Sequence, residues 1–247
     1  DITLSARSMR LQGFLGAQTF GAARGGNVLA NATDTVAILE GGGGLSTTTF
    51  GTGDAGSIIL YTRQLIVENS TNQLIGISTT ADPNSQGRGG NIEIYASESA
   101  ILSGNRPGVF VPNLNPLEIL TNPANTGLAT VSLGAGDAGD LTIETGRLIL
   151  RNGAGASTAA VGPTGNGGTL RVRATEIRVQ GQRGLSTNTF GAGRSRDLLI
   201  DTEQIVLTDG AVMLVDSFGT GDAGNLTLNT DRLTVEGYSL LGASTGA

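Results

Sequence analysis

The stretch Asp197–Gly224, DLLIDTEQIVLTDGAVMLVDSFGTGDAG, contains one complete copy of a unit that recurs along the whole chain. The unit opens with Asn or Asp and continues with two short runs in which apolar and polar residues alternate. It closes with a Ser/Thr-rich segment that ends in Phe-Gly, and Asn225 starts the next copy as NLTLNTDRLTVEG. Self-similarity at a fixed period of roughly 20–50 residues is typical of a solenoid, a propeller or an array.

Eight units are found when each is taken to start after a turn glycine. The starts are spaced by 26, 30, 34, 49, 29, 28 and 28 residues and fall at Asp1, Asn27, Ser57, Asn91, Asp140, Thr169, Asp197 and Asn225. In six of the eight units, apolar residues stand 1, 3, 8 and 10 positions after the start. The units at Asn27 and Asn91 shift the second pair by one residue, which predicts a one-residue insertion at a corner.

The repeat predicts an all-β fold, because side chains two apart lie on the same face of a strand. Each apolar pair is one short strand, and the Ser/Thr-rich segment is a third. Three short strands and three corners in about 28 residues make one coil of a right-handed parallel β-helix. About eight coils then form a single body over residues 1–247.

Stacking of coils about 4.8 Å apart places equivalent residues over one another as ladders. We predict four aliphatic ladders in the interior and an Asn/Asp ladder at the strand openings, with hydrogen bonds from coil to coil. A third kind of ladder is an aromatic stack at one corner, formed by Phe20, Phe50, Phe190 and Phe218. Because the chain begins and ends inside a repeat, we expect it to be a fragment of a longer protein.

Composition excludes several classes of function. The chain has 40 Gly, no Cys, no Trp and no His, and all 15 basic residues are Arg. A formal net charge of −6 argues against a nucleic-acid partner, which needs a basic face. Without cysteine there is no disulfide framework and no thiol chemistry. No run of 18 apolar residues is present, so no membrane span is expected.

The unit that starts at Asn91 is 49 residues long, and its surplus is NRPGVFVPNLNPLEILTNPANTG, residues 105–127. Four of the six prolines of the chain lie in this segment. Proline cannot donate to a strand ladder, so we predict a loop insertion. Three interpretations remain open: a tolerated surface insertion, a segment that docks on the coil face, or a partner-binding loop. The partner-binding candidates are Phe110, Leu114, Leu117 and Ile119.

Three turns with the sequence GDAG place Asp54, Asp137 and Asp222 at equivalent positions. Stacked carboxylates in glycine loops can bind calcium through oxygen ligands. The nonapeptide calcium pattern G-G-x-G-x-D is absent, however, so turn chemistry is the favoured interpretation and calcium the weaker one. No other metal or cofactor is expected.

Catalysis on a β-helix would require carboxylates that converge on a groove beside basic residues. The candidates are Glu144, Glu176, Asp201 and Glu203, near Arg147, Arg171, Arg173 and Arg178. Because the chain has no His, no Cys and no nucleophile elbow, we interpret these charges as a solvated face and expect no enzyme activity. We also place the pairs Thr47/Thr49 and Thr187/Thr189 on an outward face, where a threonine row that binds ice is a remote alternative.

The segments GDAGNLTLNTDRLTVEG (221–237), GLSTTTFGTGDAG (44–56) and NIEIYASESAILSG (91–104) resemble the repeats of filamentous-haemagglutinin-like exoproteins. These are large two-partner-secretion adhesins of Gram-negative bacteria, and repeats of this kind are common in cyanobacterial proteins. The resemblance covers nearly the whole chain except 105–127. It implies a right-handed β-helical stalk, export through an outer-membrane pore partner, and adhesion or aggregation at the cell surface.

We therefore expect a non-catalytic rod or fibre segment of a large secreted or cell-surface adhesin. Its expected partners are a cell-surface or glycan receptor and, by end-to-end association, other copies of itself. One alternative is a carbohydrate-active β-helix enzyme or a polysaccharide-binding module, which a groove with two carboxylates and an arginine would favour. A further alternative is a calcium-stabilised repeat module.

Overall fold

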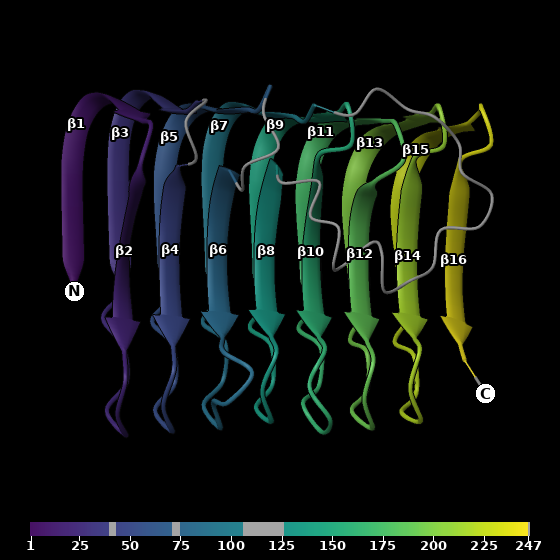
Figure 1. The fold of residues 1–247 in the computed structure, drawn as a ribbon. Coiled ribbons are helices and arrows are strands. Elements are labelled where there is room, and N and C mark those ends of the chain that lie inside the picture. The colour runs from purple at the N-terminus through teal and green to yellow at the C-terminus, as the bar shows by residue number, and fades with distance from the viewer. Residues whose placement is uncertain (40–42, 71–74, 106–125, 247) are drawn as a thin grey trace.

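The fold is a parallel β-solenoid. The computed structural model describes residues 1–39, 43–70, 75–105 and 126–246, and these ranges contain strands, turns and bends but no helix. The chain alternates between two parallel eight-stranded sheets, with about 29 residues per turn. Odd-numbered strands form a long-strand sheet and even-numbered strands a short-strand sheet, and the two termini lie at opposite ends of the rod (Figure 1).

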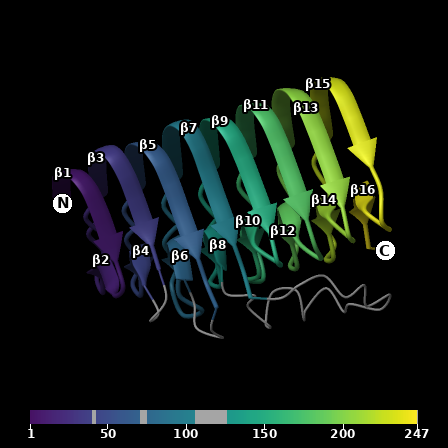
Figure 2. The same ribbon diagram turned by 90° about the horizontal axis from the view of Figure 1, so that it is seen from above.

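The long-strand sheet has strands of 10 to 12 residues, in the spatial order of the sequence: β1 (Ile2–Leu11), β3 (Val28–Ile38), β5 (Ile58–Glu68), β7 (Ile92–Ser103), β9 (Leu141–Arg151), β11 (Leu170–Gln180), β13 (Leu198–Thr208) and β15 (Leu226–Val235). The short-strand sheet has strands of 6 or 7 residues: β2 (Phe14–Thr19), β4 (Gly44–Thr49), β6 (Ile75–Ala81), β8 (Thr126–Ser132), β10 (Gly155–Ala160), β12 (Gly184–Thr189), β14 (Val212–Ser217) and β16 (Leu240–Thr245). Seen from above, the curved long strands pass over the row of short ones (Figure 2).

Each coil has two strands because the two alternating runs of the repeat join into one bent strand. In β11, Val172 and Ile177 are buried, and the alternation between them is interrupted at Thr175 and Glu176, neither of which is buried. Two successive residues that avoid the core turn the strand without ending it. The two short strands predicted for this part of the coil are therefore the two arms of a single bent strand.

The one-residue insertions predicted for the units at Asn27 and Asn91 are confirmed as register shifts at this bend. Ile2 pairs with Val28, but Met9 pairs with Val36, so β3 has one extra residue. The same shift separates β7 from β5 and from β9. The insertions change the bend only, because pairing resumes on both sides of it.

The four predicted aliphatic ladders fill the interior. From β3 to β13 every member of these ladders is at most 2 % exposed, as in Leu141, Leu170 and Leu198, which lie on three successive strands. Members on the end strands β1 and β15 are partly buried or exposed, since each has a neighbour on one side. Fully burying such a side chain contributes about 1.5–3 kcal/mol, so the interior strands gain most from stacking.

The predicted ladder of strand-opening residues is also confirmed. Asp1 Oδ1 accepts a hydrogen bond from the backbone N–H of Asn27 at 2.7 Å, and Asn27 Oδ1 accepts one from Ser57 at 2.9 Å. Asp140 Oδ1 and Asp197 Oδ1 do the same for Thr169 and Asn225. Each of these side chains therefore fixes its coil to the next one.

The aromatic stack forms as two separate pairs on the surface. The ring centroids of Phe20 and Phe50 are 4.9 Å apart, and those of Phe190 and Phe218 are 4.8 Å apart. Phe20 is 73 % exposed, so its ring lies largely outside the coil. Each pair joins adjacent coils at the corner after a short strand, as predicted.

The outward placement of the threonine pairs is wrong. Thr47, Thr49, Thr187 and Thr189 are fully buried, with 0 % exposure. Their hydroxyls are satisfied inside the coil: Thr47 Oγ1 donates to the carbonyl of Gly56 at 2.5 Å and Thr187 Oγ1 to that of Arg196 at 2.6 Å. A threonine row exposed for ice binding therefore does not exist at these positions.

A column of glycines lets the short strands begin close together. Gly44 and Gly76 have φ values of 151° and 147°, which disfavour other residues. A Cβ on Gly44 would lie 1.7 Å from the carbonyl oxygen of Gly76. Any side chain here would separate the strands.

The predicted insertion is shorter than expected at its C-terminal end. Thr126 and Gly127 pair with Ile75 and Gly76, so β8 begins inside the range 105–127. The candidate partner residues Phe110, Leu114, Leu117 and Ile119 lie outside the described residues. Ladder pairing on both sides of the segment is continuous, since β7 pairs with β9 and β6 with β8.

Candidate functional site

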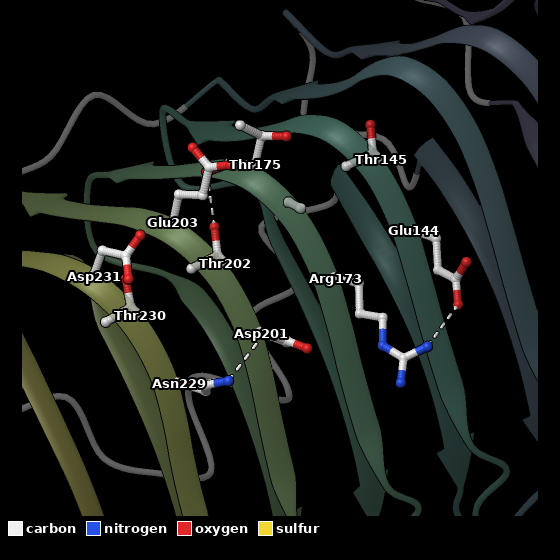
Figure 3. A pocket seen from close by; sticks show the side chains of 11 residues that line it. Glu144, Thr145, Arg173, Thr175, Asp201, Thr202, Glu203, Asn229, Thr230 and Asp231 are labelled. Carbon is white, nitrogen blue, oxygen red and sulfur yellow. Dashed lines mark hydrogen bonds and ion pairs between the residues drawn. The ribbon is translucent and has the colours of Figure 1, made fainter.

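A furrow runs along the outer surface of the long-strand sheet at the bend of β9, β11, β13 and β15 (Figure 3). It is open to solvent and has a volume of about 540 Å³. Its lining consists of two outward columns and the residues between them. The first column is Glu144, Arg173, Asp201 and Asn229; the second is Thr175, Glu203 and Asp231; the floor is Thr145, Ala174, Thr202 and Thr230.

Strand alternation produces this arrangement. On β13, Asp201 and Glu203 are exposed, whereas Thr202 between them is 8 % exposed and turned toward the core. Parallel pairing sets Arg173 opposite Asp201, and Asp201 opposite Asn229. Equivalent side chains on successive strands therefore form columns about 4.8 Å apart that run parallel to the rod.

The floor threonines hold the bend. Thr202 Oγ1 donates to the carbonyl of Thr175 on the neighbouring strand at 3.1 Å. Thr145 and Thr230 donate to carbonyls two residues further along their own strands, at 3.3 and 3.1 Å. These hydroxyls are engaged with the backbone, so the furrow presents the side chains of its two columns to a ligand.

The first column is internally paired. Arg173 Nη1 lies 3.7 Å from Glu144 Oε1, and the Asn229 amide donates to Asp201 Oδ1 at 3.3 Å. The second column differs, because within the described ranges no side-chain hydrogen bond or ion pair holds Glu203 or Asp231. A smaller hollow of about 210 Å³ adjoins the furrow, and Arg171, Leu199 and Thr227 contribute to it.

Half of the predicted charged candidates converge on the furrow. Glu144, Arg173, Asp201 and Glu203 line it. The other half lies apart. Glu176 forms a 2.6 Å ion pair with Arg178, Arg171 lines the adjoining hollow, and Arg147 is not among the furrow residues. Sequence reasoning missed Asn229 and Asp231, which extending the same two repeat positions to the next unit would have found.

The GDAG aspartates act as acceptors between coils. Asp54 Oδ1 accepts a hydrogen bond from the backbone N–H of Arg88 at 2.8 Å. Asp137 Oδ1 accepts one from Asn166 at 2.8 Å, and Asp222 pairs with Arg194 at 3.1 Å. An arginine or asparagine thus lies between successive aspartates of this turn column. The structure does not bring the three carboxylates together.

A second charged cluster lies at the bend of β3, β5 and β7. The Arg63 guanidinium bonds Asp34 at 2.5 Å on one side and Glu98 at 2.6 Å on the other. The hydrogen bonds from Arg63 lower the pKa of both carboxyls. Asp34 and Glu98 lie at the inserted positions of β3 and β7. The sequence therefore revealed the insertions, but not that they hold the partners of Arg63.

Two outward-facing tyrosines continue the first column on β5 and β7. Tyr61 and Tyr95 pair in register, and their rings stack with centroids 4.9 Å apart. The Tyr95 hydroxyl donates to Glu93 Oε2 at 2.9 Å, which raises the pKa of Tyr95 to about 12. On β3, β5 and β7, the stacked rings and the Arg63 cluster thus fill the positions equivalent to those that are open to solvent in the furrow.

No protein-family model matches the chain, and neither the curated proteins nor the solved structures give a match, so the resemblance to exoprotein repeats stays a prediction. Across the described ranges, no helix is long and apolar enough to cross a membrane. Within the same ranges, no three His, Cys, Asp or Glu side chains are grouped so that they could hold a metal ion.

Proposed function

We propose that this chain is a stiff rod segment of a large secreted or cell-surface adhesin, and that its role is structural. The observation that carries the proposal is the end-to-end alignment of equivalent residues over eight strands in each sheet. Each coil contacts its neighbours only, so stability and stiffness come from stacking, as in other quasi-one-dimensional proteins.

Several features support a rod that carries load along its axis. Aliphatic ladders, strand-opening Asn/Asp side chains and turn-column aspartates each connect a coil to the next. The similarity of the repeats to those of exported adhesins supports an extracellular location, an outer-membrane pore partner and a cell-surface or glycan receptor.

Stiffness is testable with a pair of spin labels on one outward column. Thr3 and Thr227 lie at the two ends of such a column, and the chain has no cysteine of its own. Labels on a Thr3→Cys, Thr227→Cys double variant should lie about 34 Å apart, since seven strand spacings separate them. A narrow distance distribution supports the rod, and a broad distribution or a much shorter distance contradicts it.

The location is testable on the cells that make the protein. An antibody raised against the chain should label intact, unpermeabilised cells. It should also reduce their aggregation or attachment. Labelling that appears only after permeabilisation would contradict the adhesin proposal and leave the measured stiffness unaffected.

A polysaccharide-binding module is a second candidate function, and the furrow favours it. An arginine and several carboxylates lie along one open surface there, and their rigid spacing follows the strands. Such a module is compatible with the rod, since a stalk can itself hold a glycan.

A further inference from the structure

Opposite charges alternate along two outward columns of this solenoid, the turn column and the column that contains Arg63. In the turn column, Arg88 lies between Asp54 and Asp137, and Arg194 lies next to Asp222. In the Arg63 cluster, one guanidinium bridges two carboxylates from the neighbouring coils. Stacking at about 4.8 Å brings equivalent charges close enough to repel one another, and a cation between two acids offsets that repulsion.

The second column of the furrow lacks this alternation. Glu203 and Asp231 occupy equivalent positions on β13 and β15, because Thr202 pairs with Thr230 and Gln204 with Arg232 on either side of them. Thr175, which carries no charge, precedes them in the column. Arg173 is already paired with Glu144. Among the described residues, the C-terminal half of the furrow therefore has carboxylates on adjacent strands with no cation between them.

The shape of the furrow indicates which kind of positively charged ligand would fit it. The absence of a metal-holding group among the described residues argues against a single metal ion. The furrow extends across four strands, and its polar side chains recur at each strand. A ligand that matches it is extended, lies parallel to the rod, and bears positive charges together with hydrogen-bonding groups.

We propose that the furrow binds a linear amino-sugar chain with free ammonium groups. The ammonium groups bind Glu203, Asp231 and Asp201, and ring hydroxyls bond Asn229 and Thr175. The polar side chains of the furrow recur at the strand spacing of about 4.8 Å, so a chain whose charged groups also recur can meet several of them at once. This inference rests on the second candidate function and adds the charge of the ligand to it.

Titration calorimetry at low salt tests the proposal with a glucosamine tetramer as the probe. The tetramer should bind, and its fully N-acetylated form, which has the same length and no charge, should bind at least tenfold more weakly. A galacturonate tetramer should not bind. A Glu203→Gln, Asp231→Asn double variant should bind the glucosamine tetramer about tenfold more weakly, as expected for lost charge-assisted hydrogen bonds.

The matched control is Glu68→Gln, Glu236→Gln, which also removes two negative charges, one at the last residue of β5 and one just after β15. It should leave binding unchanged, and this separates the furrow from attraction by the net charge of −6. Equal loss in both double variants overturns the site. Equal binding of the acetylated tetramer overturns the ammonium requirement but leaves a polysaccharide-binding module standing. Tighter binding of spermine than of the tetramer assigns the furrow to polyamines and overturns the sugar.

Discussion

Leu170→Ala measures how much one coil depends on its neighbours. Leu170 on β11 is 0 % exposed and lies between Leu141 and Leu198, which are equally buried. Replacing a buried Leu by Ala costs about 2–5 kcal/mol, and the cost rises with the cavity that remains. The strands on both sides are held at their spacing by backbone hydrogen bonds, so the cavity cannot close. We therefore expect a loss of about 4 kcal/mol.

Leu226→Ala is the internal comparison, because Leu226 ends the same ladder on β15 and is only partly buried. It has a neighbour on one side, so we expect a loss of about half that size, roughly 2 kcal/mol. Urea unfolding at a constant m-value gives both differences. Hydrogen exchange should show that Leu170→Ala also weakens protection in β9 and β13. Equal losses for the two variants, or exchange confined to β11, would refute stabilisation by stacked neighbours.

Three further substitutions test the polar contacts. Thr158→Val removes the 2.5 Å hydrogen bond from the buried Thr158 hydroxyl to the Gly168 carbonyl and should cost about 1 kcal/mol in urea unfolding. Glu98→Gln should lower the melting temperature more at pH 7 than at pH 3, because the bond from Arg63 depresses the pKa of Glu98, and the resulting stability is full above the ordinary 4.5 and is lost as pH falls through the lowered pKa. Asp216→Asn should raise the melting temperature at pH 7, since burial raises the pKa of Asp216 and penalises its charged form. That gain should vanish as acidification neutralises the wild-type carboxyl.

Each of these three has an outcome that contradicts it. An unchanged urea midpoint for Thr158→Val would mean that the buried hydroxyl contributes nothing net. A Glu98→Gln difference that is the same at pH 3 and pH 7 would exclude a charge effect. A lower melting temperature of Asp216→Asn at pH 7 would show that the bond from Ser244, at 2.7 Å, outweighs the cost of burial.

The sequence was sufficient to predict how the coils stack and which residues form the core. Apolar residues at fixed positions, such as Leu141 and Leu170, predicted the stacking direction and the register of the core. The shifted apolar pair at Val36 and Ile38 predicted a bulge in β3. Repetition works as evidence because every coil satisfies the same geometry, so eight copies report on one structure.

The sequence did not predict how the chain turns at a corner or which face a residue near the corner occupies. The pattern at Thr175 and Glu176 is compatible with a corner between two strands or with a bend inside one, and the structure shows the bend. Thr47 was placed on an outward face, yet its hydroxyl donates to the nearby Gly56 carbonyl inside the coil. Polarity alone does not predict the face of a residue when a turn supplies a buried acceptor.

The furrow illustrates the same limit. Its charged residues were recognised one by one, and their convergence depended on knowing that positions 4 and 6 of each unit flank an inward residue at the bend. The sequence did not reveal this, because the bend was known only from the structure. The unpaired state of Glu203 and Asp231 is likewise a relation between coils, which emerges when the columns are read along the rod.

The uninterrupted pairing around the 49-residue unit has a practical consequence. This corner contains some twenty additional residues, yet Leu102 still pairs with Leu150. It is therefore a site in the solenoid that tolerates insertions. Foreign epitopes or small reporter domains could be inserted at this corner without changing the sequence of the other coils. Adding or removing coils between this corner and an anchored end would then set the distance of the inserted domain from the anchor in steps of about 4.8 Å.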